Sequence, residues 1–197
     1  LCIEEGIMPP TRKFQKEDII EAGLKLTEER GFDSLNTRIL ANMLGCSVQP
    51  LFHNFTNMEE LKQSVFEKIY DVYREYMCVD VNKENSYKEQ GLGYIKFAIE
   101  HPEFFKAIFM KSSDLNVTDF VMHDDKLDDI IRSGQKLTGF SYEKQKEFHI
   151  KVWIFTHGIA CLVAMRTIVM DEAEIAKLLE STVREMMIGF KEKEDKK

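Results

Sequence analysis

Two long stretches with helical apolar spacing lie near the C-terminus and limit the folds that this chain can adopt. In residues 171–191, apolar side chains recur at i, i+3, i+4 and i+7 without a break, which predicts a long amphipathic helix. Residues 141–169 are apolar on nearly every side, so a helix there has to be covered from more than one direction. We interpret this apolar surplus as a four-helix interface between two copies of the chain.

The composition favours helices in the rest of the chain as well. Only 10 Gly and 4 Pro occur among the 197 residues, whereas a loop-rich all-β or disulfide-stapled fold needs turn residues at frequent intervals. With 44% hydrophobic residues, the chain can bury the cores of one or two compact units. We therefore predict an all-α protein.

Short helices are predicted over residues 16–30, 37–44 and 48–54. Gly31 and Gly45 suit the ends of the first two helices, and Asn36 and Ser47 are suitable N-caps for the second and third. Pro50 then falls in a first turn, where its missing N–H has no intrahelical partner to lose. A long helix at 57–79, a polar stretch at 80–90 and helices at 91–99 and 102–112 follow.

The expected layout has five parts. They are a leader or disordered N-terminus at 1–10, a helix-turn-helix head at 11–56, a connecting helix at 57–79, a helical domain at 80–191 and a charged tail at 192–197. The residues before Met8 are compatible with a translated ribosome-binding sequence, so we expect Met8 to be the natural start. The genomic nucleotide sequence tests whether residues 1–7 are native.

Several functional classes find no support in the residues. No GxSxG, HExxH, P-loop or dinucleotide-binding glycine pattern occurs, and the five histidines are scattered, so we predict no catalytic site and no cofactor. The four cysteines, at 2, 46, 78 and 161, form no CxxC pair, which favours reduced thiols in the cytoplasm over a metal site. No apolar run approaches the roughly 18 residues that span a bilayer, so we expect no membrane partner.

The joint Gly45-Cys46-Ser47 between two short helices is the most informative local feature. A short helix, a tight turn with Gly and a second short helix can lay an exposed helix in the DNA major groove, although any three-helix bundle contains such corners. On the second helix, Gln49, His53 and Asn54 supply hydrogen-bonding groups that suit base edges and phosphates.

Residues 14–66 resemble the DNA-binding domain of the tetracycline-repressor (TetR) family of bacterial regulators. The matching positions, in order, are Ile20, Ala22, Leu24, Arg30-Gly31-Phe32, Arg38, Ala41, Gly45, Ser47, Leu51-Phe52, Phe55, Asn57 and Glu59-Glu60-Leu61. Residues 97–109 and the Trp-x-x-x-His-Gly element at 153–158 resemble one branch of that family. The resemblance implies a DNA-binding head followed by a ligand-binding and dimerisation domain.

The resemblance also implies roles for individual residues. DNA contacts are expected from Arg38, Ser47, Val48, Gln49, Phe52, His53 and Asn54, with Ser47 and Asn54 on phosphates. Arg12, Lys13 and Lys16 either reach the DNA backbone or minor groove beside the site or form a disordered basic arm. The family usually has Tyr, His and Lys where Phe52, Asn54 and Met58 stand, so one hydroxyl and one cation for phosphates are missing, which predicts an atypical operator or affinity.

A ligand site and a dimer interface are expected in the C-terminal part. The predicted ligand-binding residues are Phe104, Phe105, Phe109, Trp153, His157 and Cys161, and an apolar lining with one polar handle suits a small hydrophobic effector. The same stripe can equally be packed core. The predicted dimer contacts are Ile159, Val163, Ile175, Leu179, Val183 and Met187.

The net charge of −7 lies outside the predicted head. Residues 8–56 carry six basic and six acidic side chains, so the head is neutral, which predicts modest non-specific affinity for DNA. We expect a homodimeric transcriptional regulator, a repressor by the commoner family behaviour, that binds a palindromic operator and is released by an effector. The alternative is a ligand-binding or enzymatic helical protein whose head serves only for packing. The sequence does not name the effector, the operator or the regulated genes.

Overall fold

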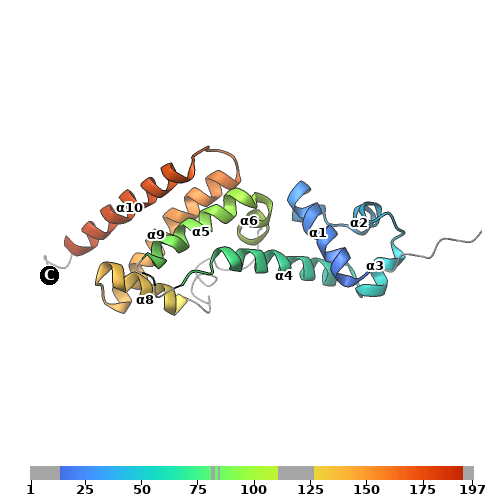
Figure 1. Cartoon of the computed structure of the whole chain (residues 1–197), viewed down its shortest axis with the longest axis horizontal. Coiled ribbons are helices and arrows are strands. Elements are labelled where there is room, and N and C mark those ends of the chain that lie inside the picture. The colour runs from blue at the N-terminus through green and yellow to red at the C-terminus, as the bar shows by residue number, and fades with distance from the viewer. Residues whose placement is uncertain (1–13, 81–82, 84, 111–126, 193–197) are drawn as a thin grey trace, which may run out of the picture. The chain divides into compact units, whose positions relative to one another are not determined.

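A computed structural model describes residues 14–80, 83, 85–110 and 127–192 (Figure 1). All of its regular elements within these residues are helical. They are α1 (Lys16–Arg30), the 3-10 helix η1 (Phe32–Ser34), α2 (Thr37–Met43), α3 (Gln49–Asn54), α4 (Met58–Tyr76), α5 (Ser86–Glu100), α6 (Pro102–Phe109), α8 (Leu127–Thr138), α9 (Tyr142–Ala164) and α10 (Glu172–Glu192). The all-α prediction is therefore confirmed for the described part of the chain.

The chain divides into two compact units, Leu1–Lys68 and Ile69–Lys197, and the division falls inside α4. The sequence placed the weakest boundary later, in the polar stretch 80–90. The last turns of α4 belong instead to the second unit, because their side chains pack in its core. The predictions for residues 1–10, for Arg12 and Lys13, and for the tail beyond residue 192 lie outside the described residues.

The first unit is organised around α1 and the first half of α4. Its core is apolar, and the side chains buried in it include Ile19, Leu26, Leu35, Leu40, Leu51, Phe55, Leu61 and Val65. The predicted cap at Asn36 is confirmed, because its Oδ1 accepts the Ile39 N–H at 2.9 Å. The cap predicted at Ser47 is wrong: Val48 occupies the N-cap of α3, where no side-chain cap bond forms.

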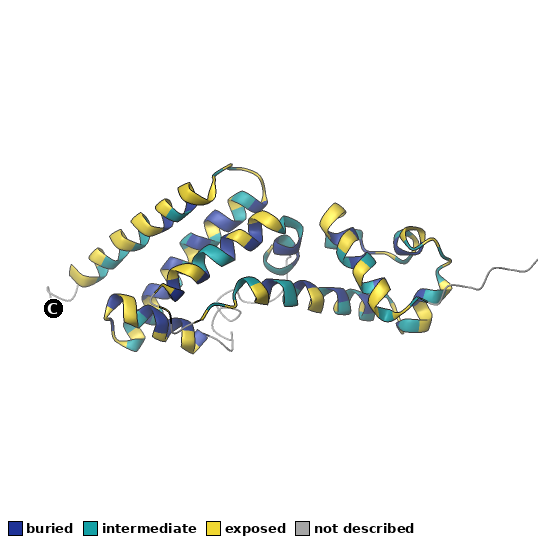
Figure 2. Cartoon of the chain, in the orientation of Figure 1, coloured by how far each residue is buried: buried dark blue, intermediate teal, exposed yellow. Residues whose placement is uncertain are grey.

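The second unit is built around α9, which packs against α5, α6, α8 and α10. Figure 2 shows buried faces on α5 and α9, whereas α10 is exposed along much of its length. Where α10 does pack, Val183, Met186, Met187 and Phe190 cover a buried cluster. The members of that cluster are Tyr87, Ile130, Phe140, Phe148 and Val152.

Helix α9 is long and apolar enough to cross a membrane by length and composition alone. Charged residues such as Lys144 and Lys151 interrupt this segment, so the sequence predicted no membrane-spanning run there. In the structure the helix is surrounded by four other helices, and Phe148 and Ala160 are fully buried. Its central place in the second unit accounts for part of its apolar character, whereas Ile154, Leu162 and Met165 stay exposed.

The last turn of α4 lies directly on the backbone of α5. A Cβ atom on Gly93 would stand 2.4 Å from the Tyr76 carbonyl oxygen, so only a glycine allows the two helices to approach this closely. The Tyr76 hydroxyl also donates to the Glu100 carboxylate at the end of α5. Both contacts hold the end of α4 against α5 within the second unit.

Replacing Gly93 by Ala should therefore destabilise the second unit. We expect the free energy of unfolding to fall by about 1–3 kcal/mol, since the methyl group forces the two backbones apart. The matched control is Gly91→Ala in the same helix, where a Cβ meets no atom within 4 Å and the change should stabilise by about 0.5–1 kcal/mol. Urea unfolding followed by the fluorescence of Trp153 measures both, and equal effects would contradict the close approach.

Candidate nucleic-acid interface and ligand cavity

The α2–turn–α3 segment has the geometry of a helix-turn-helix corner. Gly45 adopts φ +65°, a left-handed conformation that other residues rarely take, and the Cys46 N–H bonds the Ala41 carbonyl at 2.9 Å. Leu51 and Phe55 are 1% and 2% exposed, so they anchor the inner side of α3 as their spacing predicts. The turn and these two anchors fix which face of α3 points outward.

The outward side of α2 and α3 carries most of the residues predicted to contact DNA. Arg38, Ser47, Gln49 and His53 are exposed, and the ring of Phe52 is 49% exposed. Val48 is half-buried. Neither α2 nor α3 contains an acidic residue, so nothing on these helices repels a phosphate backbone.

Asn54, predicted to contact a phosphate, forms hydrogen bonds within the first unit. Its Nδ2 donates to the carbonyl oxygens of Phe14 and Pro50, each at 3.1 Å. An amide nitrogen has two protons, so both donors are already engaged. The side chain thus ties α3 to the residues before α1, and its predicted phosphate contact stays a prediction.

Lys16 is also engaged within the first unit. Its Nζ lies 3.5 Å from Glu60 Oε1 and 4.9 Å from the ring centroid of Phe55. The Thr56 N–H bonds Glu60 Oε2 at 2.7 Å; this bond, with a further contribution from Lys16, lowers the pKa of the Glu60 carboxyl. An exposed ion pair of this kind contributes little stability, so Lys16 can leave Glu60 and remains a candidate for phosphate contact.

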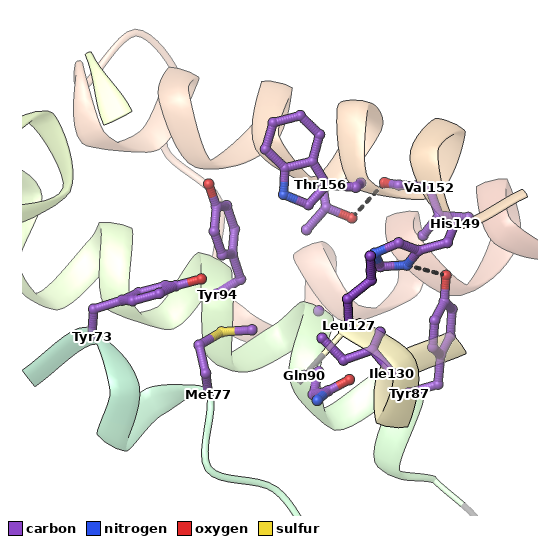
Figure 3. Close-up of a pocket in the computed structure, with 12 residues that line it drawn as sticks. Tyr73, Met77, Tyr87, Gln90, Tyr94, Leu127, Ile130, His149, Val152 and Thr156 are labelled. Atoms are coloured by element: carbon purple, nitrogen blue, oxygen red, sulfur yellow. Dashed lines mark hydrogen bonds between the residues drawn. The ribbon is translucent and has the colours of Figure 1, made fainter. Parts of the chain in front are cut away.

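The second unit contains a cavity between the end of α4 and helices α5, α8 and α9 (Figure 3). Its volume is about 70 Å³. The wall consists of Tyr73, Met77, Tyr87, Gln90, Gly91, Tyr94, Leu127, Ile130, His149, Val152, Trp153 and Thr156. A larger space of about 290 Å³ lies between α5, α9 and α10 and shares Tyr87, Gly91, Val152 and Thr156 with this wall.

Only Trp153 among the six predicted ligand-binding residues lines the smaller cavity. Phe105, Phe109 and His157 instead pack around Tyr94, with ring centroids 5.7, 5.3 and 6.1 Å from its ring. Phe104 is 3% exposed and stacks on His101 at 5.3 Å. These rings form packed core, which was the alternative interpretation of the stripe.

His157 and Cys161 belong to the same packed cluster. The Tyr94 hydroxyl and His157 Nδ1 are hydrogen-bonded at 2.8 Å, and Cys161 Sγ lies 3.4 Å from His157 Nε2. Burial lowers the pKa of His157 and raises the pKa of the Cys161 thiol. Both side chains are therefore uncharged at neutral pH and have partners within the protein.

Sequence reasoning missed the polar residues of the cavity wall. Tyr87, Gln90 and Tyr94 follow one another at helical spacing on one face of α5, all buried, but the sequence started that helix only at Gly91. In the sequence His149 is one of five scattered histidines, whereas in the structure its Nδ1 lies 3.0 Å from the Tyr87 hydroxyl. The i, i+3, i+7 spacing on α5 was the signal that could have found this face.

Half of the predicted dimer contacts are buried in a single chain. Ile159, Ile175 and Leu179 are 4%, 2% and 6% exposed, so they are core residues of the protomer and offer little surface to a second copy. Val183 and Met187 are half-buried against the core cluster of the second unit. Val163 is half-buried on α9.

Comparisons with known proteins agree with this architecture. Residues 19–65 match the model of the bacterial regulatory proteins of the tetR family. No curated protein matches the chain. Among solved structures, a TetR-like transcriptional regulator from Rhodococcus sp. RHA1 shares 15% identity at a TM-score of 0.62, with 92% of this chain and 100% of that one covered.

Two structures of TetR from Acinetobacter baumannii AYE are also similar. One shares 18% identity at a TM-score of 0.58, and a variant of that protein in complex with minocycline shares 19% at 0.52; each covers 91% of this chain and 98% of its own. The chain thus has the all-α fold of TetR-like regulators. The match to the family model itself covers residues 19–65, the segment that contains α2 and α3.

The buried pair of His149 and Tyr87 predicts a pH dependence of stability. Desolvation lowers the pKa of His149 from 6.5 to about 4, so between these values the unfolded chain binds a proton that the folded chain excludes. The free energy of unfolding should therefore fall by about 3 kcal/mol as the pH drops through this window. Urea unfolding at several pH values measures it.

The variant His149→Phe isolates this contribution from that of the carboxylates. It keeps a ring of similar size in the core and removes the titrating group, so its free energy of unfolding should fall less steeply between pH 6.5 and 4. The loss of the bond to Tyr87 lowers its stability at every pH and does not alter the slope. Parallel curves for the variant and the wild type would contradict the assignment.

Proposed function

We propose that this protein is a DNA-binding transcriptional regulator that binds a palindromic operator as a homodimer and is released by a small effector. The observation that carries the proposal is the acid-free outer face of α2 and α3, which presents Arg38, Gln49 and His53 from a helix-turn-helix corner. The match of residues 19–65 to the tetR family model supports it. Repression is the expected mode.

The residues of this face suit readout of base edges. The amide of Gln49 can form two hydrogen bonds with an adenine, and His53 can donate or accept at a base edge or a phosphate. Phe52, half-exposed, can contact a thymine methyl group. Because the head is neutral overall, the specific contacts have to supply a large share of the affinity.

A dimer can form through α9, where apolar side chains remain exposed. Ile154, Leu162 and Met165 are 58%, 41% and 55% exposed, and with Gly158 they recur at intervals of four, four and three residues on one side of the helix. An apolar stripe of this kind is more costly on a monomer than in an interface. Two heads related by a two-fold axis then read two half-sites about 34–36 Å apart.

The effector is expected in the cavity, because α4 forms part of its wall. Tyr73 and Met77 line the cavity, and α4 runs as one helix from Met58 to Tyr76. The first turns of the same helix belong to the unit that contains α3. A ligand that favours one position of Tyr73 therefore acts on the helix that joins the units, and lowers operator affinity by its differential affinity for the two conformations.

Variants of the α2–α3 face test the DNA contacts. With a duplex from upstream of its own coding sequence, Gln49→Ala should weaken binding by about 1–3 kcal/mol, because it removes a bidentate base contact. Arg38→Ala should reduce the slope of log affinity against log salt by about 0.9 for each phosphate that the guanidinium neutralises. Fluorescence anisotropy with excess non-specific competitor measures both.

Lys25→Ala is the matched control, because it removes one exposed cation from α1. It should leave both affinity and salt slope nearly unchanged. If Arg38→Ala and Gln49→Ala bind as well as the wild type, the DNA face is misplaced. If the wild type shows no specific retention of any upstream duplex, with bound effector removed by refolding, the protein is a ligand-binding or enzymatic helical protein instead.

The interface on α9 predicts that a charge there yields monomers. Ile154→Glu and Leu162→Glu place a carboxylate on the exposed apolar stripe, so burying it against a second copy is unfavourable. Light scattering should give the 23.0 kDa mass of one chain for both variants and twice that mass for the wild type. Ile99→Glu, at a residue on α5 that is 41% exposed, should stay dimeric, and dimers of all three variants would contradict the interface.

A further inference from the structure

Among the described residues, the wall of the smaller cavity contains no charged side chain. Its twelve lining residues include no Asp, Glu, Lys or Arg. His149 is the one titratable imidazole among them, and it is 9% exposed and bonded to Tyr87. Because a charged molecule would lose its hydration without gaining an opposite charge, the wall selects for an uncharged ligand.

Three hydroxyl groups of this wall already have hydrogen-bond partners inside the protein. The hydroxyls of Tyr87 and Tyr94 pair with His149 and His157 at 3.0 and 2.8 Å. The Thr156 hydroxyl donates to the Val152 carbonyl at 2.8 Å (Figure 3). These groups shape the wall but have little capacity left to bind a ligand.

Gln90 is the exception. Its side chain lines the cavity and is 5% exposed, yet its Oε1 finds no hydrogen-bond partner within the described part of the chain. A buried acceptor without a partner is unfavourable, so a ligand that offers a donor at this point gains a bond and removes the penalty. The ligand is therefore expected to carry an N–H or O–H group.

The shape and the rings of the wall limit the rest of the molecule. A volume of about 70 Å³ is below the roughly 150 Å³ of a cavity that binds benzene, so a single ring is the most that the cavity can take, and flexible side chains of the wall have to move to admit it. Tyr73, Tyr94 and Trp153 present aromatic rings to it, and aromatic rings pair favourably edge to face. Met77 and Leu127 complete an apolar surround that can adapt to a flat ring.

We propose that this cavity binds a single-ring, uncharged aromatic molecule with one hydrogen-bond donor, and that Gln90 Oε1 accepts that donor. The assignment gives a chemical class to the effector and rests on the proposed regulatory function only in calling this ligand an effector. It also moves ligand recognition from the packed cluster around His157 to the face of α5.

Phenol and toluene are the probes, because phenol carries a hydroxyl group, which can donate a hydrogen bond, where toluene carries a methyl group. Titration calorimetry on the full chain gives the ratio of their dissociation constants for the wild type and for Gln90→Leu. The cost of removing the phenol hydroxyl from water cancels in this comparison. We expect the preference for phenol to fall about tenfold in Gln90→Leu, the size of one buried hydrogen bond, and benzoate not to bind the wild type.

Two further variants keep the test decisive. Gln145→Leu removes another buried glutamine, one that does not line the cavity, and should keep the wild-type preference. If Gln90→Leu does not fold, Gln90→Met takes its place in the test, because methionine is apolar and matches glutamine in length. The proposal is overturned if phenol does not bind the wild type, if the preference survives loss of Gln90, or if benzoate binds as well as phenol.

Operator binding separates this proposal from the proposed function. Specific retention of upstream DNA without phenol binding overturns the ligand class and leaves the regulator intact. Phenol binding with the predicted dependence on Gln90, but no specific DNA binding, supports the site and overturns the regulator.

Discussion

The packing of Tyr73 into a cluster of aromatic rings is the contact on which the rest of the arrangement depends. This residue of α4 is 6% exposed, and its ring centroid lies 5.4 Å from those of Phe97 and Phe109 and 6.2 Å from that of Tyr94. Aromatic pairs of this geometry add stability beyond the burial of their area. With the close approach at Gly93, they commit the end of α4 to the second unit.

The same contact connects the cavity with the joining helix. Tyr73 belongs both to the aromatic cluster and to the cavity wall, so a ligand that displaced its ring would act on the packing that holds α4. Couplings of about 1–3 kcal/mol between sites are typical of allosteric proteins, and one aromatic pair contributes about 0.5–1.5 kcal/mol. The proposed response to an effector therefore needs no contact beyond those already in the fold.

Local signals predicted the first unit well, whereas the second depended on long-range packing. The bounds of α1, the Asn36 cap and the turn at Gly45 follow from neighbouring residues, and the structure has them. Asn54 lies next to the carbonyl of Phe14 only after folding, which no local pattern indicates. Likewise, the stripe from Trp153 to Cys161 is periodic whether it faces a ligand or a core, so the sequence left those alternatives open.

The central claim is that the exposed face of α2 and α3 reads DNA as one half of a symmetric pair. Selection of duplexes from a random pool by the full-length protein tests it most directly, because no operator has to be assumed. The account predicts enrichment of an inverted repeat whose half-site centres lie about 34–36 Å apart or at a multiple of that distance. A pool that stays random after repeated rounds would contradict it.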